Sequence, residues 1–269
     1  MAIHFEKSDD HIVVVTIDRP EAKNSADMEH FFQLRSAWER FGADDDAWVA
    51  IITGVGDAFF TGADLKRYIP EITKFQKQIA DGDVEEIDGY RIDDGVKAVL
   101  RGVKLYKPVI AAVNGYCTAG GMEMLGGIDI RLAVPEAKFA VMEPKRGLFA
   151  GGGTTVRLPR QISFPHAMEF LLCADLITAE RALAMGLLNE VVGPDELMDR
   201  AHDYARRITA NAPLAVQATK RSVLEGFGMD MRDAYKNESA IAAEIFQTED
   251  ASEGPKAFAE KRDPVWKGR

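Results

Sequence analysis

Short apolar runs rich in β-branched residues alternate with amphipathic runs along the first two thirds of the chain. The segments HIVVVTID at 11–18 and WVAIITG at 48–54 each predict a buried strand. Between them, Asn24 or Ser25 is expected to cap a helix, because apolar residues follow at helical spacing. The segment KPVIAAVNG at 107–115 repeats the arrangement and leads into a glycine-rich turn. Strand, glycine turn and helix in repetition predict an α/β fold, with ligand sites where strands lead into helices.

The pattern changes in the last third of the chain. Two more short strands are expected over 129–134 and 138–143, and from about residue 164 the pattern becomes helical. No low-complexity linker interrupts the sequence, so we expect one continuous unit with two parts. The core with the site is expected to cover 1–195, and a helical C-terminal region to cover 196–269.

The most polar interval between predicted strands covers 66–100, where charged and apolar residues are interleaved. This interleaving predicts amphipathic helices around a turn at 81–83. A segment of this length between core strands is either a lid or pocket wall, or a solvated excursion without function. The sequence favours neither interpretation.

Composition and charge narrow the class of protein. With 269 residues and 46% hydrophobic residues, the chain can bury a sizeable core. A formal net charge of −10 argues against nucleic-acid binding, although a few local cations suffice for a small anionic ligand. No apolar run approaches the roughly 18 residues of a membrane span, and MAIHFEKSDD lacks a secretion signal. Cys117 and Cys173 have no metal or disulfide spacing, so we expect a cytoplasmic protein with free thiols and no membrane or nucleic-acid partner.

Several catalytic classes are excluded because their motifs are missing. Gly115 and Gly120 have the spacing of a phosphate-binding loop, but Gly121 and Met122 follow where lysine and serine or threonine are needed. The sequence has neither the G-x-S-x-G motif of serine hydrolases nor the H-E-x-x-H motif of zinc enzymes. The glycine-dense segment at 147–155 lacks the dinucleotide fingerprint. We therefore expect no metal and no separate cofactor.

Two glycine turns remain as candidate elements of a site. Gly62-Ala63 and Gly120-Gly121 each lie between a predicted strand and a predicted helix. Unpaired N–H groups point outward at such positions, with the helix dipole behind them. If the two turns face one point, they form an oxyanion hole.

Two carboxylates accompany these turns. Glu123 lies in the first turn after the second glycine pair, and Glu143 ends the predicted strand KFAVME. If both reach one cavity, they supply an acid and a base beside a polarised carbonyl. The alternatives are an acid that only complements the helix dipole for Glu123, and a surface charge at a strand end for Glu143. Asp64 and Asp129 are interpreted as structural, because each can accept hydrogen bonds from turn or helix-start N–H groups.

Five segments carry a resemblance to a known family, in order and over nearly the whole chain. They are RPEAKNSAD (19–27), AFFTGADL (58–65), KPVIAAVNGYCTAGGMEM (107–124), DIRLAVPEAKFAVMEPKRGLFAGGG (129–153) and AFAEKRDP (257–264). Together they resemble the enoyl-CoA hydratase/isomerase, or crotonase, family. The resemblance implies a spiral of β-β-α repeats with a helical C-terminal trimerisation region, assembled as a homotrimer or as a homohexamer made of two trimers.

The resemblance also implies the roles of individual residues. The backbone N–H groups of Ala63 and Gly120 match an oxyanion hole for an acyl-CoA thioester, and Glu123 and Glu143 match the catalytic pair of the hydratases. The residues implied to bind the acyl-CoA substrate are Ala22, Ala63, Asp64, Leu65, Lys66, Gly120, Gly151, Phe258 and Lys261, of which the last two complete the site of a neighbouring subunit.

The implied reaction is the reversible hydration of trans-2-enoyl-CoA to 3-hydroxyacyl-CoA, a step of fatty-acid β-oxidation, with CoA as part of the substrate. The sequence departs from the family pattern where Ala119 replaces the first glycine of a common Gly-Gly-Gly run. Phe60 and Thr61 are bulkier than usual, and Ala150 stands where proline is common. These departures leave the chemistry intact and change the expected shape of the acyl pocket. A specialised dehydratase, a double-bond isomerase and a non-catalytic acyl-CoA-binding relative are the alternatives.

Overall fold

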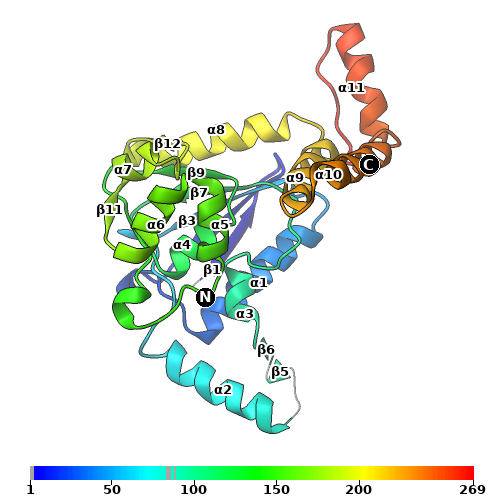
Figure 1. The fold of residues 1–269 in the computed structure, drawn as a ribbon. Coiled ribbons are helices and arrows are strands. Elements are labelled where there is room, and N and C mark those ends of the chain that lie inside the picture. The colour runs from blue at the N-terminus through cyan, green and yellow to red at the C-terminus, as the bar shows by residue number, and fades with distance from the viewer. Residues whose placement is uncertain (1–2, 83–85, 88) are drawn as a thin grey trace.

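A mostly parallel sheet forms the centre of the molecule (Figure 1). The computed structural model describes residues 3–82, 86–87 and 89–269. In spatial order the strands of this sheet are β1 (Ile3–Lys7), β2 (Ile12–Ile17), β3 (Val49–Gly54), β7 (Val109–Val113), β9 (Ile130–Ala133) and β12 (Glu190–Val191). β1 pairs antiparallel with β2, and the other neighbours pair in parallel. Every residue of β7 is buried, as expected of a central parallel strand.

A smaller sheet carries the second strand of each repeat. Its spatial order is β11 (Ile177–Thr178), β10 (Lys138–Ala140), β8 (Tyr116–Thr118) and β4 (Ala58–Phe60). The successive pairs β3–β4, β7–β8 and β9–β10 each give one strand to the large sheet and the next strand to the small sheet. The helices that follow these pairs are α2 (Tyr68–Gly82), α4 (Gly120–Leu125) and α5 (Thr154–Gln161). The predicted α/β fold with β-β-α repeats is therefore confirmed.

The other helices cover the sheets and form the C-terminal part. They are α1 (Met28–Ala43), α3 (Asp94–Ala98), α6 (Phe164–Cys173), α7 (Ala179–Ala184), α8 (Leu197–Thr209), α9 (Pro213–Gly226), α10 (Met231–Ile245) and α11 (Glu249–Glu260), with the 3-10 turns η1 (Pro20–Ala22), η2 (Pro144–Arg146) and η3 (Pro194–Glu196). α8 packs against β3 and β7, whereas α11 projects from the body of the molecule (Figure 1). Within the described ranges, no helix has both the length and the apolar character needed to cross a bilayer.

The interval 66–100 is helical at both ends. α2 forms its first half and stands at the edge of the molecule (Figure 1), and α3 ends it. Between them lies a short antiparallel pair, β5 (Glu86–Ile87) and β6 (Tyr90–Arg91), where the sequence predicted more helix. The predicted turn at 81–83 lies partly outside the described residues.

Candidate active site

The two predicted glycine turns touch each other in the structure. They follow β4 and β8, which pair in parallel. Gly62 has a φ of +85°, and a Cβ built on it would lie 2.5 Å from the Gly120 nitrogen. Gly121 lies so close to Phe60 that a Cβ would overlap the carbonyl oxygen of Phe60. In the described part of the chain, neither the Ala63 nor the Gly120 N–H donates to another backbone or side-chain acceptor. Two free N–H groups on adjoining turns are the arrangement that an oxyanion hole requires.

Both turns open into a cavity of about 570 Å³. One wall of this cavity comes from the interval 66–100, whose apolar side chains include Tyr68, Ile69 and Ile72 of α2 and Val96 of α3. The interval is therefore a pocket wall rather than a solvated excursion. The opposite side is formed by the β8–α4 turn and by the loop before α5.

Glu123 lines this cavity, half-buried, from the first turn of α4. The Gly152 N–H donates a hydrogen bond to its Oε1. Burial is the main reason that the pKa of Glu123 rises to about 7. The negative charge of Glu143 acts in the same direction, whereas the Gly152 N–H and the guanidinium groups of Arg101 and Arg157 oppose the rise in pKa. Near neutral pH this carboxyl can therefore both accept and give up a proton, as general acid–base catalysis requires.

Glu143 enters the same cavity from the residue before η2, because β10 ends at Ala140 rather than at Glu143 as the sequence predicted. β10 pairs in parallel with β8, with Ala140 opposite Thr118, so both glutamates emerge at the same edge of the small sheet. Glu143 Oε2 is buried and has no hydrogen-bond partner among the described residues. Burial raises the pKa of Glu143, because an oxygen without donors carries a negative charge poorly.

Tyr68 is held in the cavity wall by contacts on two sides. Its ring centroid lies 4.7 Å from that of Phe31. A Cβ built on Gly95 would lie 2.7 Å from its hydroxyl oxygen, so only glycine leaves room for the phenol there. Burial raises the pKa of Tyr68 to about 12, and the carboxyl groups of Asp94 and Glu123 act in the same direction. The phenol therefore stays protonated across the physiological range.

The residues implied to bind substrate separate into two groups. Ala63, Leu65, Gly120 and Gly151 line the cavity with the two glutamates. Lys66 follows Leu65 on the exposed outer side of the turn.

Asp64 holds the turn instead of lining the cavity. Its carboxylate accepts hydrogen bonds from the N–H groups of Lys66 (3.0 Å) and Arg67 (3.3 Å) and pairs with Arg19 (2.9 Å). Although burial acts to raise the pKa of Asp64, these partners lower it. The structural role expected of Asp64 thus agrees with its contacts. Ala22 ends η1 and does not line the cavity.

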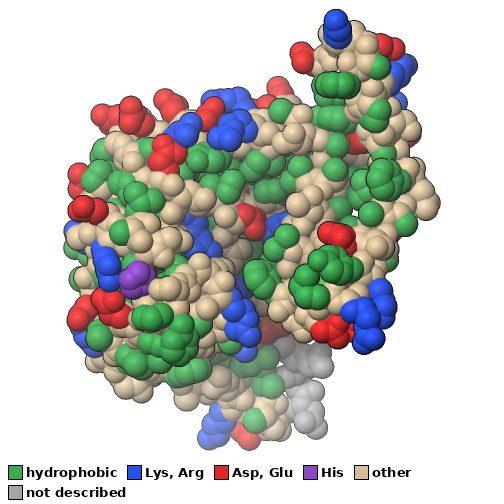
Figure 2. Space-filling model, turned by 45° about the horizontal axis from the view of Figure 1, so that its top comes forward, with side chains coloured by type: hydrophobic (Ala, Val, Ile, Leu, Met, Phe, Trp, Pro, Cys, Tyr) green, Lys and Arg blue, Asp and Glu red, His purple; other side chains and the backbone are tan. Residues whose placement is uncertain are grey.

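Phe258 lies on the projecting helix α11, and Lys261 follows directly after the end of that helix. Phe258 is 86% exposed, and neither residue lines the cavity of its own subunit. Large exposed apolar side chains gather on the C-terminal helices (Figure 2). They include Val223, Leu224, Phe227, Met231, Tyr235, Phe246 and Phe258.

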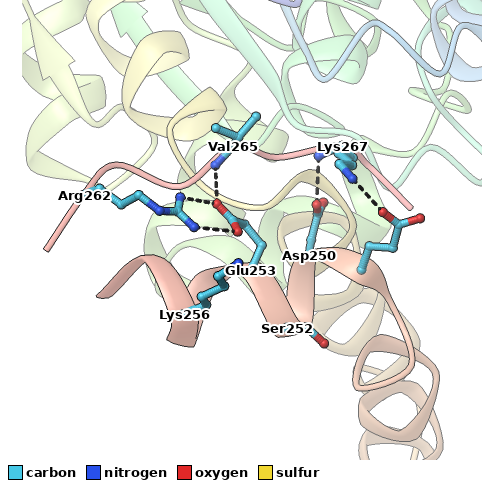
Figure 3. Close-up of a pocket in the computed structure, with 8 residues that line it drawn as sticks. Asp250, Ser252, Glu253, Lys256, Arg262, Val265 and Lys267 are labelled. Atoms are coloured by element: carbon cyan, nitrogen blue, oxygen red, sulfur yellow. Dashed lines mark hydrogen bonds and ion pairs between the residues drawn. The ribbon is translucent and has the colours of Figure 1, made fainter. Parts of the chain in front are cut away.

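A second cavity, of about 540 Å³, lies between α11 and the C-terminal tail (Figure 3). Its charged groups bind each other. Glu253 pairs with Arg262 and accepts the Val265 N–H at 2.9 Å, and Asp250 accepts the Lys267 N–H at 2.8 Å. These contacts fasten the tail to the helix. The carboxylates of this second cavity already have hydrogen-bond or ion-pair partners, and Glu123 and Glu143 do not line it. We therefore assign no catalytic role to this cavity.

Three residues near Glu123 were missed by the sequence reasoning. Gly152 donates to its carboxylate, Arg101 contacts the neighbouring Gly151 carbonyl, and Arg157 donates to the Glu123 carbonyl at 3.1 Å. The glycine-dense segment at 147–155 was a signal for Gly152. No sequence pattern singles out the two arginines.

Comparison with known proteins agrees with this geometry. The sequence model of the enoyl-CoA hydratase/isomerase family matches residues 7–269. The chain is 41% identical to Enoyl-CoA hydratase EchA19 of Mycobacterium tuberculosis, over 96% of this chain and 94% of the relative. It is 38% identical to (E)-benzylidenesuccinyl-CoA hydratase of Thauera aromatica, over the whole of both chains. A crystal structure of an enoyl-CoA hydratase from Mycobacterium tuberculosis superposes with a TM-score of 0.84 at 37% identity, covering 100% of this chain and 99% of the other. The protein therefore belongs to the enoyl-CoA hydratase/isomerase family.

Proposed function

We propose that the protein hydrates trans-2-enoyl-CoA to 3-hydroxyacyl-CoA and catalyses the reverse dehydration. One observation carries the proposal: two carboxyl groups with raised pKa values, Glu123 and Glu143, share a cavity with the free N–H groups of Ala63 and Gly120. An acid, a base and an oxyanion hole in one apolar cavity suit the addition of water beside a thioester. The names of two relatives, both hydratases, support the same reaction.

The environments of the two glutamates support different roles. Burial raises the pKa of Glu123 to about 7, and against it the Gly152 N–H and two nearby guanidinium groups favour the ionised form. Burial also raises the pKa of Glu143, one oxygen of which has no hydrogen-bond partner among the described residues, although the backbone N–H groups of Glu143 and Met142 oppose the rise. Glu123 then orients and deprotonates the water that attacks C3, while the N–H groups hold the enolate-like thioester oxygen. Glu143 delivers a proton to C2, and the coupled pair shares both titrations.

A turnover assay with crotonyl-CoA and longer enoyl-CoAs tests the proposal. A hydratase forms 3-hydroxyacyl-CoA from 2-enoyl-CoA and reverses the reaction from the product side. A double-bond isomerase moves a C–H proton without net addition of water, and a specialised dehydratase accepts only a particular hydroxyacyl-CoA. A non-catalytic relative binds acyl-CoA without turnover, which would contradict the proposal.

We propose that the protein assembles as a homotrimer or as a hexamer of two trimers. The exposed apolar side chains of α9, α10 and α11 support this, because monomers rarely leave such patches uncovered. Sedimentation or light scattering measures the assembly, and a monomer at micromolar concentration would contradict it.

A cytoplasmic location is part of the proposal. Cys117 and Cys173 are both free. Free thiols suit a reducing compartment.

Binding of the strongly anionic CoA to an acidic chain is expected to depend on local cations. Lys66 lies on the outer side of the turn that carries Ala63, and Lys261 is exposed at the end of α11, where a neighbouring subunit of the proposed trimer could use it. Lys66→Ala and Lys261→Ala should each raise KM roughly fivefold with kcat nearly unchanged, because a phosphate contact far from the reacting atoms is equal in ground and transition states. Exposed Lys104, which lines no cavity described above, provides the control Lys104→Ala. An unchanged KM in both variants would remove this assignment.

The α2 wall is expected to set the acyl preference. Tyr68→Ala and Ile69→Ala enlarge the cavity, so kcat/KM should shift toward longer or bulkier acyl groups by about tenfold relative to crotonyl-CoA. Lys74→Ala provides a control on the opposite, exposed face of α2. The measurement compares straight-chain, branched and aromatic enoyl-CoAs. If the order of preference is identical in all variants, the wall does not determine specificity.

A further inference from the structure

A single peptide unit connects Glu123 to an arginine outside the cavity. The Gly152 N–H donates to Glu123 Oε1, and the carbonyl of the same peptide, on Gly151, accepts a hydrogen bond from Arg101 Nη1. The peptide dipole therefore points its positive end at the carboxylate and its negative end at the guanidinium. Each hydrogen bond polarises the peptide in the sense that strengthens the other.

The peptide lies between two glycines, which are the residues that restrict backbone rotation least. A Cβ on Gly152 would overlap the Glu123 carboxylate, so any other residue there would displace that carboxylate from the peptide. Apart from the two adjacent residues, the nearest atoms to a Cβ built on Gly151 belong to Phe149, at 3.9 Å. Packing around Gly151 therefore does not fix the orientation of the peptide. In the described part of the chain, Arg101 is the hydrogen-bond donor to the Gly151 carbonyl.

We propose that Arg101 is a positioning residue, which locks the orientation of the Gly151–Gly152 peptide so that its N–H stays on the Glu123 carboxylate. If this peptide rotates by half a turn, the Gly151 oxygen faces Glu123 instead. A carbonyl oxygen repels a carboxylate and accepts a hydrogen bond from a carboxylic acid, so the rotated peptide holds Glu123 in its protonated form. Arg101 thereby keeps the base ready to accept a proton.

Arg157 holds the backbone on both sides of this arrangement. It donates to the carbonyls of Glu123 (3.1 Å), Val99 (3.2 Å) and Leu100. The Leu100 carbonyl belongs to the turn that carries Arg101, and Leu100 has a left-handed φ of 61°. Arg157 therefore fixes both the backbone of Glu123 and the base of the Arg101 side chain. Besides the Gly152 N–H, the charged and titratable groups that interact electrostatically with the Glu123 carboxyl are Glu143, Tyr68 and these two arginines.

Arg101 can be tested without disturbing the fold. Its side chain is exposed at the surface, whereas Arg157 donates to three carbonyls of the interior. In Arg101→Gln the pKa of Glu123 should rise, so the acid limb of the pH profile of kcat should move to higher pH by about one unit. At pH values below the Glu123 pKa, kcat should then be about tenfold lower than in wild type. At high pH kcat should return to within about threefold of wild type, because Glu123 is then ionised in either peptide orientation. KM for crotonyl-CoA should stay unchanged, and Arg101→Lys should restore most of the shift.

Arg160→Gln is the matched control, because Arg160 is also exposed and also donates to a backbone carbonyl, that of Val156. Its pH profile should coincide with that of wild type. A uniform loss of kcat at all pH values in Arg101→Gln, without rescue by lysine, would indicate a purely structural role and overturn the proposal.

The kinetic test rests on the proposed function, so a second readout is needed. The ¹³C carboxyl signal of Glu123, assigned by its absence in Glu123→Gln, reports the titration of this side chain in unliganded enzyme. Arg101→Gln should move that titration to higher pH by about one unit even at high salt, which screens the direct effect of the exposed guanidinium charge but does not change the orientation of the peptide. If the wild-type enzyme shows no hydratase activity with any enoyl-CoA, the proposed function fails, and the ¹³C titration still decides the role of Arg101. An unmoved titration overturns the inference whether or not the enzyme is a hydratase.

Discussion

Glu123→Gln and Glu143→Gln are each expected to slow hydration by about 10²–10⁴-fold, the usual contribution of a general acid or base. Glutamine keeps the size of the side chain and can still accept the Gly152 N–H, but it cannot transfer the proton. Both variants should therefore still bind acyl-CoA. The measurement is kcat for crotonyl-CoA hydration, together with a binding titration using a saturated acyl-CoA.

The double variant separates a shared mechanism from two independent effects. Because both side chains act on one water in one transition state, the double variant should lose much less than the product of the single losses. Exposed Glu136, in the β9–β10 turn, provides the control Glu136→Gln. Hydrogen exchange at C2 should disappear with Glu143→Gln. If Glu123→Gln hydrates normally and only Glu143→Gln is impaired, the two-carboxylate mechanism is wrong and Glu143 alone carries the proton transfer.

The four central strands of the large sheet were predictable from sequence, whereas its edge strands β1 and β12 and most of the small sheet were not. The apolar runs at 11–18, 48–54 and 107–115 correspond to β2, β3 and β7, because buried parallel strands are continuous apolar segments. β4 and β8 have three residues each and lie in segments that were interpreted as turns. Such short strands have no periodicity of their own. They form because Ala58 pairs with Tyr116, far away in the sequence.

The sequence also failed to predict which residue caps the start of α1. The sequence predicted Asn24 or Ser25 as the cap, but Asp27 accepts the His30 N–H at 3.2 Å. Asn24 is buried instead, where it binds the Arg19 N–H (2.9 Å) and the carbonyl of Ala58 (2.6 Å). Both residues bind backbone groups as their chemistry suggests. Which backbone group each one reaches depends on the tertiary fold.

The sequence identified most of the chemical groups in the site, but it could not predict how the fold arranges them. The sequence offered an acid and a base, with a dipole-complementing acid for Glu123 and a surface charge for Glu143 as the alternatives. Glu123 does lie in the first turn of α4, and the buried oxygen of Glu143 argues against a surface charge. Glu123 accepts the Gly152 N–H, which belongs to another segment, and Glu143 has a buried oxygen. The parallel pairing of β8 with β10 brings the two together. The influence of Arg101 on Glu123 could not be predicted, because it acts through a peptide 50 residues away.

Gly62→Ala is expected to lower kcat about 10²–10³-fold, the usual cost of losing a donor from an oxyanion hole. Gly62 has a φ of +85°, and its added Cβ would lie 2.5 Å from the Gly120 nitrogen and 3.1 Å from the Ala119 Cβ. The atoms in the way are mostly backbone, so the two turns have to separate. The Ala63 and Gly120 N–H groups then no longer converge on one oxygen. KM should change less than kcat, because the thioester oxygen carries its full charge only in the transition state.

Gly186→Ala is the matched control for this prediction. Gly186 has nearly the same φ, +80°, and no atom within 4 Å of the position of a Cβ, so alanine costs only the left-handed conformation, about 1–2 kcal/mol. Both variants should therefore lose a similar amount of thermal stability from the backbone, and only Gly62→Ala should lose catalysis. If both variants keep wild-type kcat while folded, the contact between the two turns does not set the catalytic geometry. If instead both lose kcat equally, backbone strain rather than displacement of the Gly120 N–H explains the loss.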